Sequence, residues 1–429
     1  MSVSAEKMFK MIPYGRQDIK QIDIDAVVDV LRSDFLTQGP VVPHFEQAVA
    51  ARVKAMHAIA VNSATSALHI ACLALGLGKG DLLWTVPNTF VASANCGRYC
   101  GADIDFVDID HFTWNMSLHC LREKLIKGKN KGRLPKVLVP VHFAGQPTEQ
   151  EQIWKLAQEF GFRVLEDASH SIGASRNGEP VGSCRWSDIA VFSFHPVKII
   201  TTGEGGMALT NDDELARRMA MLRTHGITRD AVRFQYSGLE VESAFTNTQP
   251  NDSTSRREIG PWYYEQQMLG FNYRMTDIQA ALGLSQLERL NNFVERRNAL
   301  ACRYKKLLQS LPLQLPAVQP ENRSAFHLYV VRLKRDVAGK SYFQVFEELQ
   351  RRGIGVNLHY MPVHLQPYYR ELGFSPGQYP ESEAHGEEAI TLPLYPALTD
   401  NEQDVVVSAL KEILSSGCVC GCPEELCGY

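Results

Sequence analysis

A lysine and an acidic residue near the middle of the chain have the types and spacing that aldehyde chemistry requires. Lys198 lies in the segment SFHPVKIITTGEGG, and Asp167 ends an apolar run 31 residues earlier (198 − 167). A lysine amine forms Schiff bases with aldehydes, and a carboxylate keeps a pyridine nitrogen protonated so that the ring accepts electrons. Apolar neighbours should also depress the pKa of Lys198, because desolvation disfavours the ammonium form. A lone lysine here would be a surface residue, but the pair predicts a pyridoxal phosphate (PLP) site with Lys198 and Asp167 as its catalytic residues.

A second group of residues is suited to hold a phosphate. The segment VNSATSA begins a helix directly after a strand-like run, 57–61, and the first N–H groups of a helix have no partner within it. We predict that Ala64 and Thr65 bind the cofactor phosphate; the alternative is that Ser63 simply caps the helix. Ser193 lies five residues before Lys198, close enough to reach the same phosphate, unless its hydroxyl bonds the local backbone.

Two ring side chains are candidates for contact with the cofactor ring. Phe90 follows a predicted strand and opens a helix, where an aromatic side chain can lie flat against a pyridine ring. Taken alone, Phe90 would more often be a core residue. His170 lies three residues after Asp167 and could contact the cofactor 3-hydroxyl or support the ring; a core histidine with its hydrogen bonds satisfied is the alternative.

The elements that must position these residues alternate between helix and strand from about 63 to 222. This pattern is typical of an α/β fold with a mostly parallel sheet, in which ligands bind at the carboxyl ends of the strands. The expected strands are 82–86, 104–107, 136–141, 163–165, 189–194 and 206–209, and the expected helices are 63–75, 91–100, 149–160 and 212–223. Asp167, Ser193 and Lys198 all fall at or just beyond such strand ends.

The pattern changes in the last third of the chain. A long helix is expected from about 276, with a continuation to 308, followed by strands at 326–333 and 355–359 and a helix at 342–352. We therefore predict a large domain over 14–290 and a smaller C-terminal α+β domain over 291–415.

The composition is that of an ordinary soluble globular protein. Of the 429 residues, 45% are hydrophobic and 21% charged, and the net charge of −4 argues against a general nucleic-acid surface. No apolar run approaches the roughly 20 residues of a membrane span. We expect a cytoplasmic protein that binds neither membranes nor nucleic acid, with six reduced cysteines scattered through its apolar segments.

Two segments have no evident place in this scheme. The tail 416–429 carries Cys418, Cys420, Cys422 and Cys427; these thiols could bind zinc, but a disordered extension is the default, and no metal site is predicted. The polar segment 237–258 is expected to be a surface loop, with a lid over the substrate as the alternative.

Three segments resemble those of the DegT/DnrJ/EryC1/StrS family of sugar aminotransferases: EDASHSIG (166–173), SFHPVKIITTGEGG (193–206) and GFNYRMTDIQAALGLSQL (270–287). The resemblance extends from about 14 to 414. It implies a fold-type I PLP-dependent transferase, with a mostly parallel seven-stranded sheet in the large domain. LTQGP (36–40), VPVHFAGQP (139–147), GPWYYEQQ (260–267) and NLHYMPVHLQPYY (357–369) further resemble the branch that aminates UDP-linked 4-keto sugars for pseudaminic acid synthesis, with L-glutamate as donor.

The resemblance also implies roles for individual residues. Ser193 would bind the phosphate, Phe90 would stack on the cofactor, and Asn272 would reach the phosphate in the neighbouring subunit, which makes a homodimer obligatory. The resemblance also suggests weaker candidates for contacts with the nucleotide sugar: Arg16, Thr37, Gln38, His359 and Tyr360. Each of them could equally be a surface or packing residue.

Two alternatives to this function stay open. One is an aminotransferase for a GDP- or dTDP-linked sugar, and the other is a PLP-binding regulator without turnover. Sugar dehydratases of the superfamily carry His where this chain has Lys198, which favours transamination over dehydration.

Overall fold

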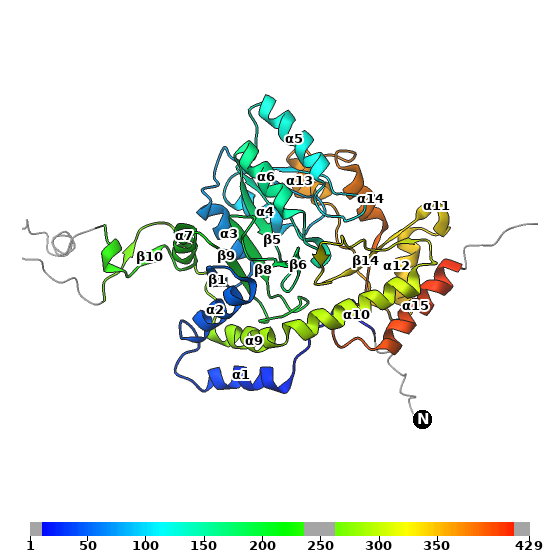
Figure 1. The fold of residues 1–429 in the computed structure, drawn as a ribbon, viewed down its shortest axis with the longest axis horizontal. Helices are drawn as coiled ribbons and strands as arrows, with labels where there is room; N and C mark the ends of the chain where they lie inside the picture. The colour runs from blue at the N-terminus through cyan, green and yellow to red at the C-terminus, as the bar shows by residue number, and fades with distance from the viewer. Residues whose placement is uncertain (1–10, 236–261, 416–429) are drawn as a thin grey trace, which may run out of the picture.

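The computed structural model describes residues 11–235 and 262–415, and its centre is a seven-stranded sheet (Figure 1). The strands run in the order β1-β9-β8-β5-β4-β2-β3, and only β9 is antiparallel to its neighbours. They are β1 (His57–Val61), β2 (Leu82–Thr85), β3 (Asp103–Phe106), β4 (Val137–Leu138), β5 (Arg163–Asp167), β8 (Ile189–Ser193) and β9 (Gly206–Thr210). The predicted α/β fold with a mostly parallel sheet is confirmed.

Helices cover both faces of this sheet, because alternate strand residues enter different cores. Val191 belongs to a core that contains α3 (Ala64–Ala74), α4 (Ala92–Tyr99) and α7 (Asp213–Arg223). Phe192 faces the opposite core, which α2 (Val41–Val53) and α9 (Asp277–Glu288) complete. On the same side as α2, Trp84 packs with α5 (Leu118–Asn130) and α6 (Gln150–Phe160). Outside α9 lies α1 (Gln21–Leu31).

A smaller group of elements follows at the C-terminal side. A sheet in the order β12-β14-β15 packs with helices around a core of its own, to the right in Figure 1. Its elements are α10 (Leu290–Leu308), β12 (Leu313–Gln314), β14 (Tyr329–Leu333), α11 (Arg335–Ala338), α12 (Tyr342–Arg351), α13 (Pro367–Glu371), α14 (Pro380–Glu388), β15 (Ala389–Leu392) and α15 (Asp400–Ser415). The domain boundary near 290 stays a prediction.

Two predicted elements differ from the structure in extent. The helix expected from 276 to 308 is two helices, α9 and α10, which meet at Arg289, whose side chain is held by Asp18 and Asp23. Strand 136–141 shrinks to β4, since Pro140 cannot donate to a ladder.

The segment 355–359 is not a strand. Gly355 N–H donates to Ile12 O, and Asn357 forms an isolated bridge with Thr391, so its partners lie on different segments. This irregular path carries His359 and Tyr360 toward the main sheet.

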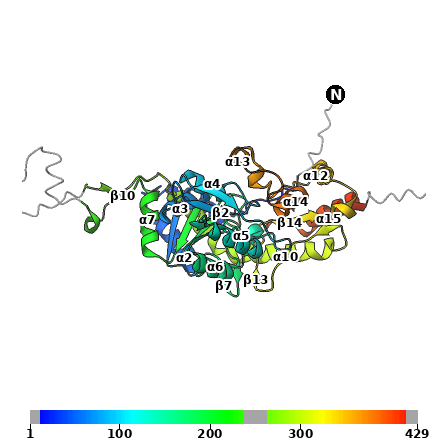
Figure 2. The same ribbon diagram turned by 90° about the horizontal axis from the view of Figure 1, so that it is seen from above.

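A short antiparallel pair of strands, β10 (Ile227–Thr228) and β11 (Glu265–Gln266), projects away from the body beyond α7 in both views (Figures 1 and 2).

A third small sheet joins β13 (Asn322–Arg323), β6 (Ser175–Arg176) and β7 (Glu179–Pro180). No helix within the described ranges is long and apolar enough to cross a membrane. The polar segment 237–258 and the cysteines of the tail lie outside the described residues.

Candidate active site

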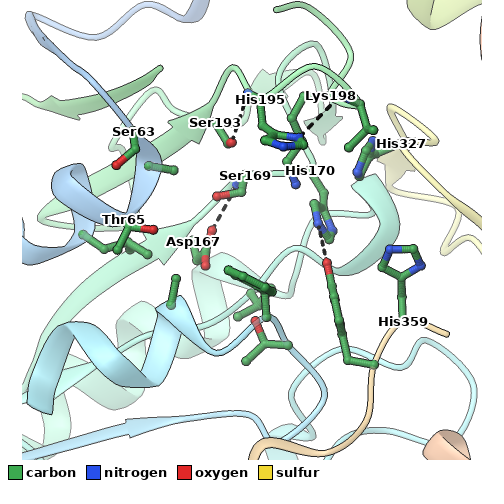
Figure 3. A pocket seen from close by; sticks show the side chains of 18 of the residues that line it. Ser63, Thr65, Asp167, Ser169, His170, Ser193, His195, Lys198, His327 and His359 are labelled. Carbon is green, nitrogen blue, oxygen red and sulfur yellow. Dashed lines mark hydrogen bonds between the residues drawn. The ribbon is translucent and has the colours of Figure 1, made fainter. Parts of the chain in front are cut away.

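A cavity of about 440 Å³ lies at the carboxyl edge of the main sheet, and it collects most of the predicted site residues (Figure 3). Ser63 and Thr65 lie on one side of it, His170, His327 and His359 on the other, and Asp167 between them. The further predicted residues on its lining are Ala64, Phe90, Ser193, Lys198 and Tyr360. The structure therefore brings together residues from five separate stretches of the chain.

Lys198 extends into the cavity from the loop after β8. Burial lowers the pKa of its amine to about 8, and the opposing attraction of Asp167 does not cancel this effect. The backbone N–H of Lys198 donates to His195 O at 2.9 Å, which holds the loop in a turn. An amine with a pKa of about 8 is partly neutral near pH 7, and the neutral form is the nucleophile.

Covalent attachment of PLP to the apo-protein should accelerate as the pH rises through about 8. The amine loses its proton over this range, so its reactive fraction is small below that pKa and nearly complete above it. Stopped-flow absorbance measures the rate. Asp167→Asn removes the carboxylate that raises the pKa of Lys198, so its profile should shift to lower pH. A midpoint near the ordinary 10.5 would contradict the burial of the amine.

Asp167 is the last residue of β5, and only 5% of it is exposed. Its Oδ2 accepts a hydrogen bond from Ser93 Oγ at 2.6 Å, and its Oδ1 accepts one from the backbone N–H of Ser169 at 3.1 Å. Both bonds fix the orientation of the carboxylate. Ser93 was missed from the sequence, because nothing in its α4 segment indicates a contact with a residue 74 positions away.

Ser93→Ala should slow transamination by roughly tenfold, because a hydrogen bond to a charged group contributes about 1.5–3 kcal/mol and part of that acts on the orientation of Asp167. Single-turnover absorbance with the amino donor measures this rate. A matched control is Ser285→Ala, which removes a buried serine bond of 2.6 Å to Asp23 away from the cavity. The control should lose stability with little change in rate, and equal slowing of the two variants would contradict the role of Ser93.

The N-terminus of α3 and the end of β8 meet at Gly206. Gly206 pairs with Ser193 on one side and with Val61 on the other, and an added Cβ would lie 2.4 Å from Ala64 N. Only glycine permits this approach. The result is a cradle in which the first N–H groups of α3 and the Ser193 hydroxyl face the same cavity, as a phosphate requires. Ser63 also caps the helix by accepting from Ser66 N at 3.1 Å.

Aromatic and imidazole rings form the opposite wall. Phe90 is 58% exposed and its ring centroid lies 6.4 Å from that of Tyr360; α4 begins two residues after Phe90 rather than at it. His170 Nε2 bonds the Tyr360 hydroxyl at 3.1 Å, and the ring lies 4.5 Å from His327. Burial lowers the pKa of His170 well below its usual value, with Lys198 adding to the effect, so the imidazole is neutral. Its buried Nδ1 has no partner in the described structure, which suits a group bound in the cavity.

The predicted sugar contacts divide into two sets. His359 and Tyr360 line the cavity, and His359 Nδ1 bonds Thr391 Oγ1 at 2.8 Å. Arg16, Thr37 and Gln38 are exposed and lie outside its lining. Asn272, the predicted contact to the phosphate in the neighbouring subunit, is also exposed and outside this lining. Gln38 lines a separate open cavity with Arg217, Arg229, Arg233 and Arg274. Tyr14 and His327 line the first cavity although their sequence context gave no signal of it.

The buried carboxylate, the lysine with its lowered pKa and the helix N-terminus beside Ser193 fit PLP, and together at this edge of the sheet they define a fold-type I PLP-dependent transferase. Residues 17–411 match the DegT/DnrJ/EryC1/StrS aminotransferase family. The chain belongs to this family, and its cofactor is PLP.

Related proteins match this chain over nearly its whole length. The spore coat polysaccharide biosynthesis protein SpsC of Bacillus subtilis is 36% identical, over 95% of this chain and 98% of its own. The putative sugar aminotransferase Spr1654 of Streptococcus pneumoniae in its PMP form superposes with a TM-score of 0.81 at 28% identity, covering 95% of this chain and 100% of that one. Helicobacter pylori PseC, an aminotransferase involved in the biosynthesis of pseudoaminic acid, has the same TM-score, identity and coverage.

Proposed function

We propose that this enzyme transfers the amino group of L-glutamate to C4 of UDP-2-acetamido-2,6-dideoxy-β-L-arabino-hex-4-ulose. The product is UDP-4-amino-4,6-dideoxy-N-acetyl-β-L-altrosamine, an intermediate of pseudaminic acid synthesis. The observation that carries the transamination is the cavity in which Lys198 and Asp167 meet a phosphate cradle. The likeness to PseC supports the choice of sugar.

PLP, when bound, supplies an electron sink for the carbanion formed at the donor Cα. With PLP bound, Lys198 Nζ would act as the base that takes the proton from the donor Cα and as the acid that gives it up again, and a pKa of about 8 suits both roles. Asp167 keeps the ring nitrogen protonated, while Ser93 and the Ser169 N–H keep the carboxylate in place. Neutral His170 adds no positive charge that would compete with the ring nitrogen for Asp167.

A different nucleotide-linked sugar is a second candidate, because SpsC shares more sequence with this chain than PseC does and is described by spore coat polysaccharide biosynthesis. One assay panel separates the candidates. The purified protein with PLP and L-glutamate is offered UDP-, GDP- and dTDP-linked 4-keto sugars, and products are identified by mass and NMR. Preference for a GDP or dTDP sugar would reject the first proposal but keep transamination. No donor half-reaction would favour a non-catalytic regulator.

We propose further that two chains share each site, since Asn272 is exposed and lies off the cavity of its own chain. An inactive Lys198→Ala chain mixed with an inactive Asn272→Ala chain should then recover about a quarter of wild-type activity, because half of the randomly formed dimers contain one intact site. The measurement is turnover after subunit exchange. The matched control mixes Lys198→Ala with Asp167→Asn: both residues come from one chain, so no activity should return. No recovery with Asn272→Ala, despite proven exchange, would place the site within one chain.

A further inference from the structure

Arg297 is a buried cation on α10 that has no place in the proposed reaction and no acidic partner. Its side chain is 1% exposed, and no carboxylate in the described ranges forms an ion pair with it. Burial lowers the pKa of its guanidinium to about 10, which still leaves the group charged at neutral pH. A buried charge without a counter-ion destabilises the fold unless its hydrogen bonds are made, so its contacts indicate its role.

The guanidinium of Arg297 joins α10 to two other segments of the chain. Nη1 donates to Phe326 O at 3.2 Å and to His327 O at 3.1 Å, both in the segment between β13 and β14. It also donates to Leu394 O at 3.0 Å, just after β15. Hydrogen bonds from a charged donor are stronger than those between neutral groups, so this one side chain fixes the segment before β14.

The segment that Arg297 fixes has a strained backbone. Phe326 has a φ of +43°, in the left-handed region that residues other than glycine rarely adopt. The N–H of Ala325 donates to Gly145 O at 2.9 Å, which ties the segment to the loop after β4. Such strain persists only where the surrounding contacts hold it, and the bonds from Arg297 are among those contacts.

This segment places His327 in the wall of the cavity around Lys198 (Figure 3). His327 is 4% exposed, and its ring centroid lies 4.5 Å from that of His170. Burial lowers the pKa of His327 well below its usual value, and Lys198, His170, Arg297 and His359 lower it further, so the imidazole is neutral. Loss of Arg297 would therefore release the backbone of His327 and remove one of the charges that keep its ring neutral.

We propose that Arg297 is a positioning residue for transamination, which acts by holding His327 against His170 in the cavity wall. The inference rests on the transamination step of the proposed function and not on the identity of the sugar. Arg297 itself does not line the cavity. Its loss should therefore slow the reaction of bound donor, because a small displacement of the groups around the reacting atoms lowers the rate steeply.

The test uses the full-length PLP-loaded protein and its half-reaction with L-glutamate, followed by rapid-mixing absorbance. Arg297→Met should lower the rate at saturating donor at least about tenfold per PLP-bound chain, and His327→Ala should have an effect of similar size. The double variant should be no slower than the slower single variant, because both changes act through one contact. Arg297→Lys keeps a charged donor and should lose only about threefold; it gives the same cycle should the methionine variant not fold.

A matched control is Arg332→Met. Arg332 is also buried and lies on β14, but it pairs with Glu381 and Glu388 and is not on the cavity lining. This variant should lose stability while its rate per PLP-bound chain stays near that of wild type.

A second readout does not depend on turnover. Deuterium uptake at the imidazole carbon of His327, measured by peptide mass spectrometry, should speed up at least about fivefold in Arg297→Met and stay near wild type in Arg332→Met. Unchanged uptake in Arg297→Met, losses that multiply in the double variant, or equal slowing by Arg332→Met would each overturn the proposal. A failure of the proposed function would show in the wild-type half-reaction, whereas these outcomes compare variants with wild type.

Discussion

Lys198→Ala is expected to abolish covalent attachment of PLP and to lower turnover by at least about a thousandfold, since it removes both the nucleophile and the group that moves the proton. Borohydride reduction and peptide mass spectrometry would show the loss of the covalent adduct. The predicted phosphate-binding residues Ala64 and Ser193 are untouched, so PLP should still bind non-covalently. Added ethylamine, small enough to enter the vacated space, should restore part of the rate by accepting the proton. A transamination rate as high as that of wild type, measured without an added amine, would show that Lys198 is not the catalytic lysine.

We also expect Lys198→Ala to remove an unfavourable contribution to the free energy of folding at neutral pH. The folded pKa of about 8 is below the ordinary 10.5, so the folded state binds fewer protons than the unfolded chain between these values. The burial of Lys198 therefore disfavours folding most below pH 8, and this effect fades as the pH rises to 10.5. Lys198→Ala should be at least as stable as wild type at pH 7, as measured by urea unfolding of the apo-protein.

Asp167→Asn should keep PLP bound and still lower the rate of the donor half-reaction by at least about a hundredfold, because an amide cannot hold a proton on the pyridine nitrogen. The substitution also leaves the hydroxyl of Ser93 facing a weaker acceptor. Rapid-mixing absorbance with L-glutamate gives the rate, and retained cofactor is measured by gel filtration and absorbance.

A matched control for this experiment is Asp23→Asn. Asp23 is fully buried, accepts from Ser285 and pairs with Arg289, but it lies away from the cavity. Its amide variant should lose stability, since it breaks a buried charged network, while the rate per folded molecule stays near wild type. A loss smaller than threefold in Asp167→Asn would mean that another carboxylate serves the ring nitrogen.

Much of the candidate site could be predicted from the sequence because its parts follow local rules. A strand that ends in Asp167, a helix that begins at Ala64 and a lysine just after β8 are each recognisable within a short window. Strand ends of a parallel sheet share one edge, so the topology alone brings these residues near one another. Their roles in catalysis and phosphate binding stay predictions until the variants are measured.

Other features required contacts between distant segments. The bond of Ser93 to Asp167, the approach of Gly206 to Ala64 and the place of His327 beside His170 appear only when the helices and strands are packed. The break at Arg289 likewise depends on carboxylates more than 260 residues away along the chain (289 − 23).

The amino-acid sequence by itself determined the chemistry of this protein: a lysine, a carboxylate and a helix N-terminus in an order that matches one family, with strands and helices that alternate as that family requires. Tertiary structure decided which side chains surround those groups and which predicted contacts, such as Arg16 and Gln38, lie off the cavity of the same chain. The physical reason is how far apart along the chain the interacting residues lie. Helix starts, strand ends and apolar periods come from neighbouring residues, whereas burial, which sets the pKa of Lys198 and encloses Arg297, is produced by segments that meet only in the folded chain.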